Sequence, residues 1–268
     1  MKNILVRILL ILGILLAIAG IVFVCYGVYK KFTLDIPNPV ATMEVEGYGT
    51  VKIELYPDKA PNTVANFIRL ANRGFYNGTT FHRTMPDFVI QGGARQGDTT
   101  ASPMLSDIMD NVENDAEYNI PGEFIANGYE ENNIKHEKGV ISMARSDYSS
   151  WGYTTEGYNS AGCQFFIVTG DDSSSSLDGL YAAFGKVIEG MDVVEKISNV
   201  EVYYRDSEVD SDYEAPKDED GNQIQSDTPK KEPVIKSITV ETYGVDYGVP
   251  NTVEPFDLNS LYSQYLGH

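Results

Sequence analysis

The chain has 268 residues and a formal net charge of −19 at neutral pH. The first 31 residues hold four cations and no acid, so the remaining chain has 16 Lys and Arg against 39 Asp and Glu. A surface this negative repels phosphate backbones, which argues against nucleic acid as a partner. Hydrophobic residues make up 42% of the chain, enough for one sizeable core. The two cysteines, Cys25 and Cys163, are far apart and offer no disulfide framework.

An apolar segment opens the chain. The 22 residues from Ile8 to Tyr29 carry no charge and would span about 33 Å as a helix, enough to cross a bilayer core. The sequence therefore predicts an uncleaved single-pass membrane anchor over 1–31 and a linker over 32–40. A cleaved signal peptide is the alternative, but the run is long for one and no small-residue cleavage site precedes Lys30. Lys and Arg flank the run equally, so charge does not set orientation. We expect the larger part of the chain to be extracytoplasmic.

Glycines recur every seven residues in this segment, at Gly13, Gly20 and Gly27. Small residues on one helix face allow close packing, so weak self-association is a hypothesis. The alternative is that glycine is simply common in membrane helices.

The region from 41 to 243 is organised as many short strands and two helices. Apolar residues alternate over 41–46 and 51–56, which predicts a hairpin, and residues 60–74 show helical spacing that ends at Gly74. Further strands are expected at 139–144, 164–169, 181–188 and 233–243, with a short helix at 191–197. Residues 95–138 read as loop, 203–229 as an acidic mobile insertion, and 244–268 as a tail without an assignment. This pattern predicts one mostly-β barrel or sandwich domain.

The stretch 81–94, FHRTMPDFVIQGGA, combines apolar residues with two strong hydrogen-bonding side chains. Arg83 can grip a carbonyl, and Gln91 can both donate and accept. Together with Phe81, Phe88, Val89 and Ile90 they predict a shallow apolar site with two polar groups.

Four blocks in order resemble the cyclophilin family of peptidyl-prolyl isomerases: FHRTMPDFVIQGG, GVISMAR at 139–145, CQFFIVT at 163–169 and LDGLYAAFGKVIEGMDVVEKI at 177–197. IPGEF at 120–124 and IKHEKG at 134–139 look more like bacterial members. The resemblance implies an eight-stranded antiparallel β-barrel capped by two helices. It also implies proline-containing polypeptides as substrates and no cofactor. The three histidines show no metal-ligand spacing.

By this resemblance the catalytic residues are Arg83, Gln91 and Phe88. A guanidinium near the amide nitrogen would stabilise the twisted X-Pro bond more than either planar form. The substrate-binding residues by the same resemblance are Val89, Ala144, Arg145, Gln164, Phe166, Leu177 and Tyr181.

This sequence departs from the family pattern at the rim of that site. Val89, Arg145 and Tyr181 stand where members often have methionine, asparagine and histidine, and Ser176 stands where many carry tryptophan, which bears on cyclosporin affinity. The departures at Arg145 and Ser176 leave a second hypothesis open, a non-catalytic scaffold or holdase for proline-containing segments. A hydrolase has no support, because the matched blocks contain no Ser-His-Asp or Cys-His arrangement.

Overall fold

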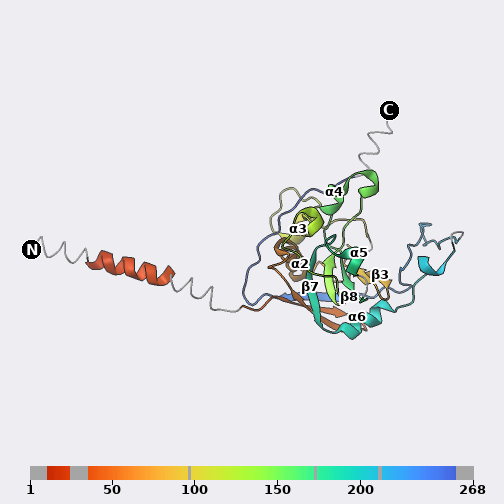
Figure 1. The fold of residues 1–268 in the computed structure, drawn as a ribbon, viewed down its shortest axis with the longest axis horizontal. Coiled ribbons are helices and arrows are strands. Elements are labelled where there is room, and N and C mark those ends of the chain that lie inside the picture. Colours follow the sequence, from red (N-terminus) through yellow and green to blue (C-terminus); the bar gives the residue numbers. More distant parts are fainter. Residues whose placement is uncertain (1–10, 25–35, 96–97, 172–173, 211–212, 258–268) are drawn as a thin grey trace, which may run out of the picture. The chain divides into compact units, whose positions relative to one another are not determined.

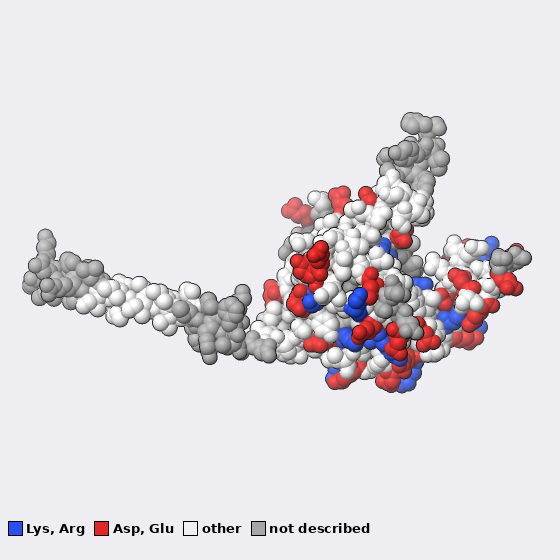
Figure 2. Space-filling view, viewed as in Figure 1, with Lys and Arg blue, Asp and Glu red and all other residues white. Residues whose placement is uncertain are grey.

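The computed structural model describes residues 11–24, 36–95, 98–171, 174–210 and 213–257, in two compact units, Met1–Pro37 and Asn38–His268. In the first unit, residues 11–24 form a helix with exposed side chains, none of them charged (Figure 2). Within the described residues, no helix has both the length and the apolar character needed to cross a membrane. The anchor predicted over Ile8–Tyr29 runs past the described helix at both ends, and Gly27 lies outside the described residues.

The second unit is built on one eight-stranded sheet in which every strand pair is antiparallel (Figure 1). Its order is β3-β4-β6-β5-β7-β2-β1-β8. A bridge between Thr80 and Val234 joins the two ends of this order, so the sheet curls into a barrel closed by a short contact. The eight antiparallel strands of the prediction are confirmed. Their bounds are β1 Val40–Val45, β2 Gly49–Leu55, β3 Phe81–Met85, β4 Val89–Gly92, β5 Val140–Met143, β6 Phe165–Val168, β7 Ala183–Glu189 and β8 Ile235–Glu241.

The barrel core follows from the period-two alternation of side chains along each strand. Met43 and Val45 on β1 are almost fully buried, as are the alternate β2 residues Val51, Ile53 and Leu55. Gly47 and Gly49 have positive φ angles, which lets the chain reverse tightly between the two strands. The predicted hairpin is therefore confirmed.

Two main helices pack beside the sheet. Helix α2, Pro61–Asn72, lies against β8, and α6, Met191–Ser198, lies near β2, β3 and β4. Glu123, in the IPGEF block, accepts hydrogen bonds from the backbone N–H groups of Asn62 and Thr63 at 3.0 and 2.8 Å, so a distant residue caps α2. The shorter helices are α3 Leu105–Ile108, α4 Thr154–Tyr158, α5 Ser174–Leu177, η1 Ile125–Asn127, η2 Ser149–Trp151 and η3 Asp206–Glu208.

Residues 244–257, part of the predicted tail, pack against the barrel unit. Val253 forms a bridge with Asn119, and the Asn251 carbonyl accepts a hydrogen bond from the Asn62 side chain at 3.0 Å. The Arg69 Nε donates to the Gly248 carbonyl at 2.8 Å. This segment is therefore part of the fold, and alternation of apolar residues gave no signal for it because hydrogen bonds hold it.

The stretch 81–94 forms two strands, β3 and β4, joined by a turn at residues 86–88. The two faces of this hairpin have different roles. Phe81 and Ile90 point into the barrel core, whereas Phe88 and Val89 belong to a second apolar cluster. The expectation that all four apolar residues share one site was therefore wrong, because the pleat sends neighbouring residues to opposite faces.

Candidate active site

A lateral row of side chains crosses the outer face of the sheet. Arg83 on β3 pairs with Gln91 on β4, Gln91 pairs with Phe166 on β6, and Phe166 pairs with Ser142 on β5. Residues opposite one another in a sheet share a face. The row therefore places a guanidinium, a carboxamide and an aromatic ring side by side on the surface that does not face the core.

An apolar cluster separate from the barrel core surrounds Phe166. It brings together every predicted pocket residue of apolar or aromatic type, although they come from β4 and the turn before it, the residue after β5, β6, α5 and the segment before β7. Leu177 and Phe166 are buried, at 6% and 4% exposed, and the partly buried Phe88, Ala144 and Tyr181 bring the cluster to the outer surface; we refer to this apolar surface as the hollow. Its buried members are Val89, Val140, Phe166, Val168, Leu177 and Ala183, with Phe88, Ile134, Ala144 and Tyr181 packed against them.

The turn that carries Phe88 is held by the end of β6. The Thr169 N–H donates to the Phe88 carbonyl at 2.8 Å, and the Thr169 Oγ1 donates to the Met85 carbonyl at 3.1 Å. A Cβ on Gly170 would lie 1.9 Å from the Asp87 carbonyl oxygen, so only glycine lets these backbones approach. Phe88 is thus positioned by backbone contacts.

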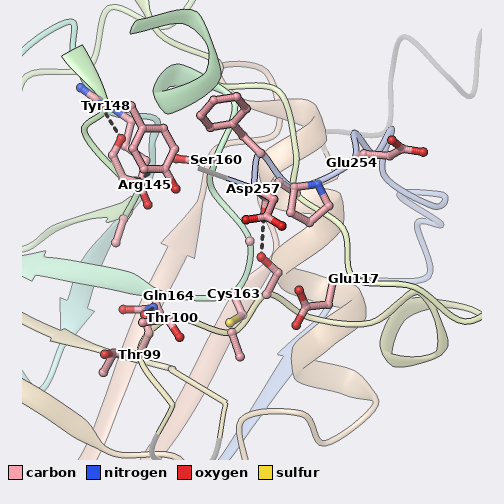
Figure 3. A pocket seen from close by; sticks show the side chains of 18 of the residues that line it. Thr99, Thr100, Glu117, Arg145, Tyr148, Ser160, Cys163, Gln164, Glu254 and Asp257 are labelled. Atoms are coloured by element: carbon pink, nitrogen blue, oxygen red, sulfur yellow. Dashed lines mark hydrogen bonds between the residues drawn. The ribbon is translucent and has the colours of Figure 1, made fainter. Parts of the chain in front are cut away.

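Two glutamines link the hollow to a second, polar cavity. Gln91 donates from Nε2 to the Gln164 Oε1 at 3.0 Å, and Gln164 donates to the Thr99 carbonyl at 2.7 Å. The Ala144 N–H donates to the Gln164 carbonyl at 2.9 Å. The cavity beyond them has a volume of about 950 Å³. Figure 3 shows Gln164 and Thr99 on one side of it and Glu254, from the C-terminal segment, on the opposite side.

Arg145, predicted as a substrate-binding residue, stabilises the rim of the site through its side chain. Its guanidinium carbon lies 4.7 Å from the ring centre of Tyr181, 4.9 Å from that of Tyr158 and 5.7 Å from that of Phe124. It also donates to the Leu180 carbonyl at 2.9 Å. Cation–π contacts of this kind hold the Tyr181 ring against the hollow. The Arg145 side chain therefore stabilises the rim of the site at Tyr181.

Arg83 and His82 have different electrostatic environments. Arg83 is partly buried, and among the residues that the structure describes none forms a hydrogen bond or ion pair with its guanidinium. Burial, and secondly the adjacent guanidinium, lower the pKa of His82 to about 4, so its imidazole is neutral at neutral pH. Arg83 therefore carries its positive charge without a carboxylate partner in the described part of the chain.

Sequence reasoning missed a buried Ser-His-Asp chain beneath the hollow. His136 Nε2 lies 3.1 Å from the Ser142 Oγ, and its Nδ1 lies 3.3 Å from an Asp178 carboxylate oxygen. The matched blocks contain Ser142 and Asp178 but not His136, which lies in the 134–139 stretch, so the blocks alone did not show this arrangement. His136 and Ser142 are both 0% exposed, so the hydroxyl is closed to substrate and the arrangement gives no nucleophile. No sequence spacing signals this cluster, because Asp178 is 42 residues from His136.

The fold and the site together define a β-barrel protein whose outer surface carries an apolar cluster, two hydrogen-bonded glutamines and an arginine that has no partner among the described residues. Comparison with known proteins identifies the family. The family model for cyclophilin type peptidyl-prolyl cis-trans isomerase/CLD matches residues 40–240. The chain therefore belongs to the cyclophilin-type peptidyl-prolyl isomerase family, and it is an enzyme of that isomerase class.

Individual relatives agree with this. The chain is 37% identical over 158 residues to peptidyl-prolyl cis-trans isomerase B of Bacillus subtilis, covering 59% of this chain and 90% of that protein. It is 31% identical over 203 residues to peptidyl-prolyl cis-trans isomerase B of Escherichia coli, covering 72% and 94%. Its structure is similar to a cyclophilin type isomerase of Cryptosporidium parvum solved in the presence of the dipeptide Ala-Pro. The TM-score is 0.52 at 26% identity, covering 75% and 98% of the two chains.

Proposed function

We propose that this enzyme accelerates X-Pro isomerisation in exported or surface polypeptides by stabilising the twisted amide with Arg83. Rotation about the X-Pro bond has a barrier of roughly 18–20 kcal/mol and takes tens to hundreds of seconds without a catalyst. In the twisted state the amide nitrogen loses its double-bond character and becomes a hydrogen-bond acceptor. A guanidinium donor near that nitrogen lowers the barrier because it binds the twisted state more strongly than the planar ones.

The observation that carries this proposal is the row Arg83, Gln91 and Phe166. The proline ring would occupy the hollow at Phe166, and Gln91 would hold the substrate backbone. The Arg83 guanidinium would then stand one strand spacing from Gln91 without a competing carboxylate among the described residues. A charged donor that keeps its hydrogen-bonding capacity for the transition state needs this kind of environment.

A protease-coupled assay on an X-Pro peptide tests the mechanism. Arg83→Ala should lower kcat/KM on the order of 100-fold, as loss of a transition-state donor does in other enzymes. Arg83→Lys should recover only part of the rate, because an ammonium lacks the planar fork. Arg73→Ala is the matched control, because Arg73, the residue after α2, is an arginine that pairs with Asp110 at 2.9 Å and lies outside the site. Full activity of Arg83→Ala would exclude the mechanism.

The cellular setting belongs to the same proposal. We place the enzyme in a bacterial cell membrane, with 1–31 as a single-pass anchor and the isomerase domain on the extracytoplasmic side. Support comes from the uncharged run Ile8–Tyr29 and the basic residues on both sides of it. Protease added to intact cells should digest the domain, and carbonate washing should leave the full chain in the membrane. If the domain resists the added protease, the proposed action on exported polypeptides would have to be abandoned.

Weak self-association through Gly13, Gly20 and Gly27 is a further part of the proposal. In the described helix, a Cβ on Gly13 or Gly20 would meet nothing within 4 Å, so this face is open to a partner. Crosslinking at native expression should give dimers that Gly20→Leu abolishes. Monomers alone would remove the idea.

A further inference from the structure

The outer edge of β3, the strand that carries Arg83, is covered by the two arms of the acidic insertion at 203–229. The arms are the segments by which the chain leaves the barrel and returns to it. β3 lies at one end of the sheet order, so its outer backbone groups need partners. The returning arm supplies them: the Thr84 N–H donates to the Asp227 carbonyl at 2.9 Å, and the Phe81 N–H donates to the Pro233 carbonyl at 2.9 Å. The insertion lies next to β3 in Figure 1. Thr84 is the residue directly after Arg83.

One buried ion pair ties both arms of the insertion to this strand. The Arg205 Nη1 donates to the Thr84 carbonyl at 2.8 Å and to the Asp227 carboxylate at 2.9 Å. The two side chains are 17% and 6% exposed, unlike the surface pair Lys230–Glu201 in the same arms, whose side chains are 47% and 76% exposed. Both backbone polar groups of Thr84 are therefore held by the insertion.

Asp227 holds this position with a strained backbone. Its φ is +60°, a conformation that few residues other than glycine adopt, and the residue is 4% exposed. The arms themselves pair through the Val202–Pro229 bridge and the hydrogen bond from the Asp227 N–H to the Tyr204 carbonyl. Strained buried residues of this kind persist where the surrounding structure requires one geometry. Here that geometry belongs to the backbone beside Arg83.

We propose that Arg205 and Asp227 are positioning residues for catalysis. They fix the backbone of β3 at Thr84, so that the Arg83 guanidinium keeps its position beside the hollow. The inference rests on the proposed function. The pocket walls Val89, Phe166 and Leu177 lie on other elements, so loss of the clamp leaves peptide binding intact and slows turnover. This separates a positioning role from a general structural one.

The test compares Arg205→Met, Arg205→Lys and the matched control Lys230→Ala in the full chain. Arg205→Met should lower kcat/KM on the order of tenfold or more, because small misplacements of catalytic groups are costly. Its dissociation constant for an Ala-Pro peptide should stay within twofold of the wild type. Arg205→Lys should recover part of the rate, and Lys230→Ala should match the wild type. An unchanged rate for Arg205→Met, or an equal loss of binding and rate, would overturn the proposal.

Hydrogen exchange provides a measurement that does not depend on whether a variant folds. In the wild-type protein the Thr84 amide should exchange as slowly as that of Ile90 in the core, and exchange as fast as in exposed loops would contradict the clamp. Asp227→Asn serves as a second variant, because asparagine tolerates positive φ. It should speed Thr84 exchange and lower kcat/KM.

If Arg83→Ala keeps full activity, the proposed function fails; if Arg83→Ala is inactive and the clamp variants are not impaired, only this inference fails.

Discussion

The imidazole of His136 stacks on the ring of Phe166, with 6.0 Å between their centres and 22° between their planes. The same imidazole meets the edge of Tyr181 at 6.5 Å. Asp178 accepts a hydrogen bond from the His136 backbone N–H at 2.8 Å. His136 therefore connects its own loop to the loop of Asp178 beneath the hollow. The shape of the hollow therefore depends on the imidazole of His136, which is itself fully buried.

His136→Phe should destabilise the protein while keeping a ring against Phe166. It removes the imidazole partner of the Ser142 hydroxyl and of the Asp178 carboxylate, which should lower the free energy of unfolding by about 1–3 kcal/mol. Urea denaturation measures this. Ser142→Ala is the control, with a smaller loss because only one hydrogen bond disappears. Unchanged stability in His136→Phe would show that these contacts contribute nothing.

His82 should make the protein sensitive to moderate acid. Its pKa of about 4 in the folded protein lies below the ordinary value of 6.5, so between these values the folded state binds fewer protons than the unfolded chain. The free energy of unfolding should therefore fall as the pH drops from 6.5 to 4, with His82 contributing about 3 kcal/mol.

His136 changes stability in the same direction, because burial lowers its pKa as well. An NMR titration of each imidazole separates the two histidines. The His82 signal should not titrate above pH 5.5. A midpoint near 6.5 for His82 would contradict the buried, neutral imidazole beside Arg83.

Arg145→Met should loosen the rim at Tyr181. The variant loses three cation–π contacts and the hydrogen bond to the Leu180 carbonyl, which should cost about 1–2 kcal/mol of stability. Affinity for an X-Pro peptide should fall several-fold, since Tyr181 packs against Phe166 at 5.4 Å. Arg145→Lys should lie between the two. Titration of peptide into each variant measures the effect, and wild-type affinity for Arg145→Met would refute it.

Phe256→Ala should release the C-terminal segment from the polar cavity. Phe256 lies 4.8 Å from the Tyr153 ring and 5.4 Å from the Tyr148 ring, and loss of both contacts should cost roughly 2 kcal/mol. Amide exchange in residues 251–257 should accelerate. Trp151→Ala is the control, because Trp151 is 51% exposed and its ring centre lies 6.4 Å from that of Tyr148. Equal amide exchange in both variants would show that the Phe256 ring contacts do not hold this segment in place.

The barrel could be predicted from sequence because its signals are local. Val51, Ile53 and Leu55 alternate along β2 and face the core, and Val64 and Phe67 of α2 face it at helical spacing. The period of the apolar residues is therefore enough to identify each element as strand or helix. The pocket residues needed the family resemblance as well. Phe166 and Leu177 are plain apolar residues, and only their register beside Gln91 places them on the outer face.

The remaining contacts could not be predicted because they join residues far apart in sequence by single hydrogen bonds. The insertion was expected to be mobile, but its arms are fixed by Arg205, which bonds to a carbonyl 121 residues away. The Ser142–His136–Asp178 chain and the Glu123 cap of α2 are of the same kind. Polar contacts of this type leave no period in the sequence.

The most direct test of the central claim is NMR exchange on an X-Pro peptide bound to the wild type and to Arg83→Ala. The wild type should speed exchange between the cis and trans signals, and Arg83→Ala should bind the peptide with similar affinity but lose most of that acceleration. Binding without exchange in the wild type would favour the scaffold. Undiminished exchange in Arg83→Ala would contradict stabilisation of the twisted amide by Arg83.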